Sequence, residues 1–228
     1  ITCYSVEEDQ DGNDIVKIPL GCWKYFCDEF PNEGPYPKTK LKCSKKLLCL
    51  DPDCGPDFVY DIDKKSRDQD KVFKEGMKIL LKNHVLFLAL FTGFGKSSLA
   101  NYMACKLKVK VAVICFYEMV RKQLIAEFEN FGGAKVQDLS KSKKVDMTAD
   151  VFVIGTIKSS LMKSTDFSFI GLVIFDEAHI STATALSKSL LRFTPKYLIG
   201  LSATPDRSDG LDKMLNMYFG KPDEFIDT

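Results

Sequence analysis

Residues 85–98 read Val-Leu-Phe-Leu-Ala-Leu-Phe-Thr-Gly-Phe-Gly-Lys-Ser-Ser, and this stretch decides the fold. The apolar run from Val85 to Leu90 predicts a buried strand, and a helical pattern begins at Lys96. The two glycines between them let the backbone turn its N–H groups inward. A glycine-rich turn that joins a strand to a helix is typical of a phosphate-binding loop.

The side chains of this loop match that chemistry. Lys96 is expected to reach the β- and γ-phosphates of a nucleotide, and the hydroxyl of Ser97 is expected to bind Mg²⁺. The first position of the pattern is usually Gly or Ala and is Leu90 here, which leaves the phosphate-contacting part intact. A tight turn ahead of a core helix would explain the glycines, but not the lysine and hydroxyl beside them. The predicted nucleotide-binding residues of the loop are Leu90, Phe91, Thr92, Gly93, Phe94, Gly95, Lys96, Ser97 and Ser98.

The segments around the loop alternate apolar strands with amphipathic helices. This alternation predicts an α/β fold, in which a parallel sheet is covered by helices on both faces. The expected strands are 85–90, 109–116, 151–154, 172–175 and 197–201. The expected helices are 69–82, 96–107, 119–131, a short one near 158–162, and 182–193. The first helix is expected to place Phe73, Met77, Leu80 and Leu81 on one side.

The first quarter of the chain differs from the rest in composition. It holds several prolines and glycines and only short apolar runs, such as 15–20. Residues 1–64 are therefore predicted to form a small β-rich or irregular N-terminal accessory module, ahead of a nucleotide-binding lobe at 65–228. The chain opens with Ile1 and has no signal peptide, so we expect it to be part of a longer polypeptide.

Composition narrows the class of protein. The 228 residues are 45% hydrophobic, enough for a packed core, and no apolar run approaches the roughly 20 residues that a membrane helix needs. We therefore expect no membrane span. The net charge of +1 does not indicate a nucleic-acid binder, so any such surface must be local. Lysines cluster at 38, 40, 42, 45 and 46 and again at 141, 143 and 144, although a solvated edge is the simpler explanation for each cluster.

Six of the eight cysteines lie in the first 54 residues. None forms a Cys-x-x-Cys pair, so their spacing is looser than in common zinc sites, and a metal site is the less favoured interpretation. Cys105 and Cys115 lie in apolar helix and strand patterns and are expected to be small core residues. Disulfides are disfavoured in reducing compartments. We expect an intracellular, reducing location.

Two carboxylates follow the strand 172–175, in the sequence Asp176-Glu177-Ala178-His179. Ligands bind at the carboxyl edge of a parallel sheet, where this pair would emerge. Asp176 fits a carboxylate that holds Mg²⁺ through water, and Glu177 fits the base that activates the attacking water. Taken alone, the pair could equally be an acidic turn that caps a helix.

A third segment, Gly200-Leu201-Ser202-Ala203-Thr204-Pro205, also follows a strand. Alone it is a Ser/Thr turn. Phosphate loop, Asp-Glu-Ala-His and Ser-Ala-Thr, in this order and each at a strand end, resemble motifs I, II and III of the superfamily 2 helicases of the DEAH type. The resemblance covers residues 65–228 and implies the first RecA-like lobe of a P-loop NTPase that uses ATP and Mg²⁺.

The resemblance also implies roles that spacing does not reveal. Gln69 resembles the glutamine that recognises adenine. The residues that couple the ATP state to binding of the nucleic-acid strand are resembled by His179, Ser202 and Thr204. The segment 113–123, with Arg121, is similar to motif Ia, and Ile154-Gly155-Thr156 is similar to motif Ib. Both motifs touch the nucleic-acid backbone, and a threonine hydroxyl and a glycine amide are suitable phosphate contacts. Arg121, Gly155 and Thr156 are thus the predicted nucleic-acid contacts.

The tail from Ser202 to Leu211 and the loop Thr92-Gly93-Phe94-Gly95-Lys96 resemble the DNA-directed branch of these motors. That branch includes excision-repair translocases, phage recombination helicases and the poxviral transcript-release helicase of large DNA viruses. The resemblance implies DNA as a partner and association with transcription or repair machinery. It also implies a second RecA-like lobe of the same polypeptide, which no segment of this sequence resembles, and a location that includes a virion or a viral factory in host cytoplasm. Three alternatives stay open: an RNA helicase, a nucleotide-dependent docking subunit without motor activity, and a small-molecule kinase, which would not need motifs II and III.

Overall fold

The computed structural model describes residues 5–22, 69–155, 165–178, 192–203, 212–220 and 226–227. Three predicted site residues, Thr156, His179 and Thr204, lie outside the described residues. So do the expected helix near 158–162 and most of the one expected at 182–193. The end of the latter prediction is wrong, because Arg192 lies in a turn and Phe193 in a loop.

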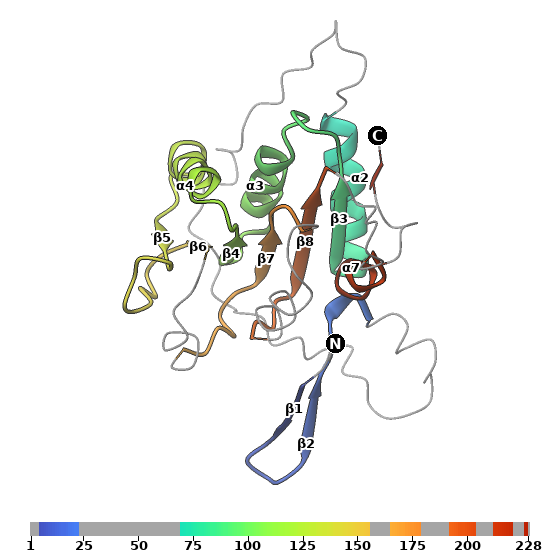
Figure 1. Ribbon diagram of the computed structural model, residues 1–228, viewed down its shortest axis with the longest axis vertical. Helices are drawn as coiled ribbons and strands as arrows, with labels where there is room; N and C mark the ends of the chain where they lie inside the picture. Colours follow the sequence, from blue (N-terminus) through green and yellow to red (C-terminus); the bar gives the residue numbers. More distant parts are fainter. Residues whose placement is uncertain are drawn as a thin grey trace, which may run out of the picture.

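A parallel sheet forms the centre of the described structure (Figure 1). Seven described strands run in the order β5-β6-β4-β7-β8-β3-β9, and each described pair in this sheet is parallel. The strands are β3 (Val85–Ala89), β4 (Val111–Ile114), β5 (Val136–Asp138), β6 (Val151–Ile154), β7 (Leu172–Phe175), β8 (Tyr197–Ser202) and β9 (Ile226–Asp227). The predicted α/β fold is therefore confirmed.

Helices cover both faces of this sheet. The helices are α2 (Gln69–Asn83), α3 (Lys96–Leu107), α4 (Glu118–Gly132) and α7 (Asp212–Phe219). Successive residues of a strand point to opposite faces, and β3 shows the result. Its Leu86 and Leu88 belong to the core beneath α2, α3 and α4, whereas Phe87 packs in the second core with Phe219 of α7. Because both faces are buried, the strands read as unbroken apolar runs.

Several details differ from the sequence prediction. Strand β5 and helix α7 are not among the expected elements, and strand 109–116 shortens to Val111–Ile114. Leu81 was expected on the buried side of α2 but is 52% exposed, while Val72 is buried at 3%. The cause is helical geometry: Leu81 is one residue, or about 100°, beyond the buried Leu80, which turns it away from the sheet.

The described part of the N-terminal segment is a two-stranded antiparallel hairpin, with β1 at Ser5–Glu8 and β2 at Asp14–Lys17. The short 3-10 helix η1 (Leu20–Cys22) follows and packs on α7. Gly21 allows this contact, because a Cβ atom there would lie 2.6 Å from the carbonyl oxygen of Met217. The hairpin fits the expected β-rich character of this segment.

Candidate nucleotide-binding site

The loop after β3 adopts the conformation that its glycines permit. Gly93 and Gly95 have φ angles of 85° and 91°, in the left-handed region that other residues rarely occupy. Helix α3 begins directly after Gly95, so its N-terminus, with unpaired N–H groups and partial positive charge, faces the loop. A strand, a left-handed glycine turn and a helix N-terminus together form an anion-binding cradle.

Leu90 departs from the usual first residue of this loop, and the structure explains the departure. Its side chain is 1% exposed and packs in the core beneath α2, α3 and α4. Its backbone oxygen accepts a hydrogen bond from Nζ of Lys96 at 3.0 Å. The side chain of Leu90 therefore packs in the core, and only its backbone contacts Lys96 of the loop.

Gln69 is the first residue of α2 and lies against the phosphate loop. Its Nε2 donates a hydrogen bond to the carbonyl oxygen of Phe94 at 2.7 Å. A Cβ atom at Gly95 would lie 2.7 Å from the same Nε2, so this contact depends on the glycine. Gln69 thus stabilises the loop from the side of α2, and its role in reading adenine stays a prediction.

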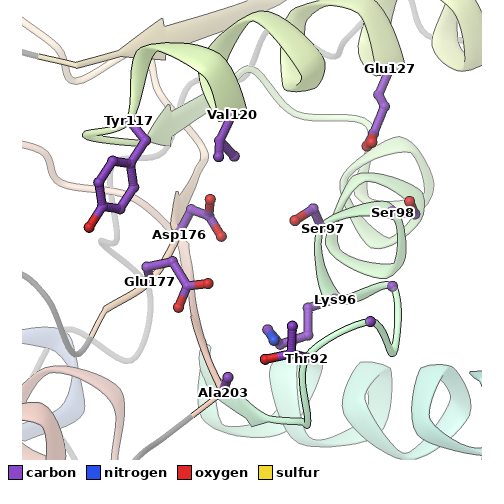
Figure 2. Close-up of a pocket in the computed structure, with 12 residues that line it drawn as sticks. Thr92, Lys96, Ser97, Ser98, Tyr117, Val120, Glu127, Asp176, Glu177 and Ala203 are labelled. Carbon is purple, nitrogen blue, oxygen red and sulfur yellow. The ribbon is translucent and has the colours of Figure 1, made fainter.

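The acidic pair lies at the same edge of the sheet as the phosphate loop. Asp176 and Glu177 follow β7, which is separated from β3 by β8 alone. Glu177 has a φ of 49°, a strained value for a residue with a side chain, and such strain concentrates at functional sites. In Figure 2, Asp176 faces Ser97 across the pocket, and Glu177 lies beside Asp176, on the side opposite Lys96.

The Asp176 carboxyl is in an unfavourable place for a negative charge. It is 6% exposed, and burial, together with the charge of Glu177, raises its pKa above the usual range. A hydrogen bond with the Cys115 thiol and the charge of Lys96 oppose that rise in pKa. Burial, with the charge of Asp176, also raises the pKa of Cys115 to about 12. A buried carboxylate of this kind is suited to a cation.

These residues enclose a pocket of about 650 Å³. Its walls come from the phosphate loop with the start of α3, from α4, and from the ends of β7 and β8. The donor groups fit a magnesium-bound nucleotide: Ser97 and Asp176 offer oxygen, which Mg²⁺ prefers, and Lys96 and the helix N-terminus offer positive charge to phosphates. The described residues hold no group of three His, Cys, Asp or Glu suited to bind a metal alone. Mg²⁺ commonly keeps waters and substrate phosphates as its other ligands.

The pocket includes residues that sequence reasoning missed. Tyr117, Val120 and Glu127 line it from α4 and the residue before that helix, and Ala203 lines it after β8. The spacing of 120 and 127 places both on one side of a helix, but nothing in the sequence says which element that side faces. Ser202 itself is fully buried, and its backbone oxygen accepts the N–H of Leu90 at 3.1 Å.

The predicted nucleic-acid contacts lie elsewhere. Arg121 is 8% exposed, and its Nε lies 3.3 Å from Oδ2 of Asp138 in an ion pair. The N–H of Gly155 donates to Oγ of Ser140 at 2.7 Å, so in this structure that amide is occupied and does not offer itself to a phosphate. A Cβ atom at Gly155 would lie 2.3 Å from Nη1 of Arg121, so these two residues are neighbours. Their contact with nucleic acid stays a prediction.

Residues 64–207 match the family model described as type III restriction enzyme, res subunit. The chain belongs to this family. The match of this res-subunit domain spans the phosphate loop, the acidic pair and the Ser-Ala-Thr segment. The parallel sheet covered by helices gives this domain the fold of a RecA-like lobe.

Two viral relatives of the res-subunit domain carry helicase names. The chain is 38% identical to "Putative helicase 161L" of Invertebrate iridescent virus 6 over 217 residues, which is 92% of this chain and 45% of that protein. It is 29% identical to "Putative ATP-dependent RNA helicase L396" of Acanthamoeba polyphaga mimivirus over 150 residues, which is 61% of this chain and 29% of that protein. The chain thus spans less than half the length of either relative.

Among solved structures, the chain resembles the SWI2/SNF2 ATPase core of Sulfolobus solfataricus in complex with dsDNA. The TM-score is 0.55 at 20% identity, over 68% of this chain and 36% of that one. At this identity the likeness concerns the fold. In the part of the chain that the structure describes, no helix has the length and apolar character to span a membrane.

Proposed function

We propose that this chain is the ATP-binding half of an ATP-dependent DNA helicase or translocase of superfamily 2, of the DEAH type. The observation that carries the proposal is one pocket that joins Lys96 and Ser97 of the phosphate loop to Asp176 and Glu177 of the acidic pair. The two pairs are at least 79 positions apart in the sequence, so an isolated glycine turn does not account for their meeting.

Each of these side chains has a chemical role in ATP hydrolysis. Lys96 leaves the backbone oxygens of the loop and pairs with the β- and γ-phosphates, while the N–H groups at the start of α3 hold phosphate oxygens. Ser97 and Asp176 would hold Mg²⁺, Asp176 through water. When bound, Mg²⁺ neutralises negative charge on the phosphate oxygens. Glu177 orients the attacking water and accepts its proton.

The choice of DNA as substrate rests on the likeness of the 202–211 tail and the phosphate loop to the DNA-directed branch, that of excision-repair translocases and the poxviral transcript-release helicase. The fold neighbour from Sulfolobus was solved with dsDNA, whereas the mimivirus relative is named an RNA helicase. An RNA helicase is therefore the second candidate. ATP hydrolysis by the intact protein, measured with duplex DNA, single-stranded DNA and RNA, separates them. Stimulation by RNA alone would overturn the choice of DNA.

The proposal includes partners for this half of the motor. A second RecA-like lobe of the same polypeptide would close over the pocket and supply an arginine to the transition state. We further propose residues 1–64 as an accessory module, and an intracellular, reducing location with transcription or repair machinery nearby. A docking subunit without motor activity is the alternative, and failure of the intact protein to hydrolyse ATP with any nucleic acid would favour it.

A further inference from the structure

Helix α4 turns one side toward the nucleotide pocket, and the charged residue on that side is Glu127. Val120 and Glu127 both line the pocket, and their spacing of seven residues is two helical turns (Figure 2). Leu124, between them on the same side, is buried at 3%. A carboxylate on a side that otherwise buries apolar groups costs free energy unless it is hydrogen-bonded or paired with a cation.

A hydrogen bond fixes the position of this carboxylate. Nδ2 of Asn101, a buried side chain of α3, donates to Oε2 of Glu127 at 2.9 Å. Asn101 is four residues beyond Ser97, so the two lie on the same side of α3. The carboxylate of Glu127 is therefore held by a residue one helical turn beyond Ser97, and Figure 2 shows it directed toward α3.

The charges of the pocket favour a cation near Glu127. Three carboxylates line it, those of Glu127, Asp176 and Glu177. Burial raises the pKa of Glu127, and the charge of Asp176 adds to that rise, so the two groups are close enough to repel each other. The described residues form no group of three or more His, Cys, Asp or Glu that could hold a metal alone. Glu127 lines the same pocket as Ser97 and Asp176, while its hydrogen bond to Asn101 holds it on the side of α4, so its reach to a metal would be through water.

We infer that Glu127 is a positioning residue that accepts hydrogen bonds from the water ligands of the Mg²⁺ held by Ser97 and Asp176. The inference rests on the proposed function and adds to it a residue of α4, outside the motifs that carry the helicase resemblance. Mg²⁺ keeps several waters in nucleotide sites, and the residues that hold such outer ligands change metal affinity by about 10- to 100-fold when replaced.

The test uses Glu127→Gln, which removes the charge but keeps an oxygen that can accept from Asn101. Glu129→Gln, on the exposed side of the same helix, is the matched control. Calorimetry gives the affinity of each variant for ADP with excess Mg²⁺ and with EDTA. Titration of Mn²⁺ as the metal probe, followed by its electron paramagnetic resonance signal with ADP present, gives the metal affinity separately from any enzymatic activity.

We expect Glu127→Gln to lower the affinity for the metal by about tenfold and to leave the affinity for ADP in EDTA unchanged. Glu129→Gln should behave like wild type in both measurements. Equal metal affinities in Glu127→Gln and wild type would overturn the inference while leaving the proposed function standing. So would an equal loss of ADP affinity with and without metal, because it would indicate a structural role. If the unsubstituted chain binds ADP no better with Mg²⁺ or Mn²⁺ than without, the proposed function fails and this inference fails with it.

Discussion

Nζ of Lys96 donates a hydrogen bond to the backbone oxygen of Leu90 at 3.0 Å, across the loop that is expected to hold phosphates. A second loop oxygen, that of Phe91, lies 3.5 Å from the same nitrogen. The loop's own carbonyl groups thus stabilise the ammonium group, and Lys96 is 9% exposed. The lysine is already directed into the loop, so nucleotide binding exchanges one set of oxygen partners for another without a large rearrangement.

Lys96→Ala is expected to weaken ATP binding by roughly 10- to 100-fold, because a charge-assisted hydrogen bond contributes about 1.5–3 kcal/mol. The free energy of unfolding should fall by about 1.5–3 kcal/mol at most, the value of a hydrogen bond that involves a charged group. Calorimetry with ATP and urea unfolding measure the two effects. Lys78→Ala, on the exposed side of α2, is the control. Equal ATP affinity in Lys96→Ala and wild type would overturn the assignment of the phosphate loop.

Asp176→Asn is expected to stabilise the chain in the absence of nucleotide and magnesium. Burial and the charge of Glu177 raise the pKa of Asp176, so the folded state binds its proton more tightly than the unfolded state does. The ionised carboxylate therefore opposes folding, and this cost grows as the pH rises from about 4 toward 7. Asparagine removes it, so the gain in unfolding free energy over wild type should increase over that range.

Urea unfolding of both proteins at each pH measures this difference. With MgADP present the order should reverse, since only wild type gains stability by binding the metal complex. A gain that is the same at pH 4 and pH 7 would contradict the electrostatic explanation.

The core of the site could be predicted because each part carries its own local signal. Lys96 and Ser97 follow a glycine turn, and Asp176 and Glu177 end an apolar strand, so parallel pairing brings them to one edge without knowledge of the strand order. Strand β5 lacks such a signal, since three half-buried residues at the edge of a sheet show no apolar run. Glu127 and Tyr117 could not be predicted for the pocket, because their place in it depends on how α4 packs against α3 rather than on any pattern within α4.

Gly95→Ala is expected to impair nucleotide binding, and Gly133→Ala provides a matched control. Both glycines have positive φ angles, 91° and 56°, so alanine costs about 1 kcal/mol of backbone strain at either position. At Gly95 the added Cβ atom would also lie 2.7 Å from Nε2 of Gln69, whereas at Gly133 it would meet nothing within 4 Å.

Both variants should therefore be less stable in urea unfolding, but Gly95→Ala alone should lose ADP affinity in calorimetry. Gln69→Ala provides a second test. It removes the hydrogen bond to Phe94 without straining the backbone, so it should lower the ADP affinity less than Gly95→Ala does. Gly133→Ala losing as much affinity as Gly95→Ala would show that general destabilisation, not the loop, is responsible.

Glu177→Gln is expected to separate ATP binding from hydrolysis in the intact protein. The side chain lines the pocket and follows the buried Asp176, but it is assigned to the attacking water and not to the phosphates. Losing a general base costs about 10²- to 10⁴-fold in rate, while ATP affinity measured by calorimetry should change little.

This chain by itself is expected to hydrolyse ATP about 10³-fold or more slowly than the intact protein, because the second lobe is proposed to supply the arginine that stabilises the transition state. Glu177→Gln should therefore alter the rate strongly in the intact protein and scarcely in this chain. A chain that turns over ATP as fast as the intact protein would refute the two-lobed motor.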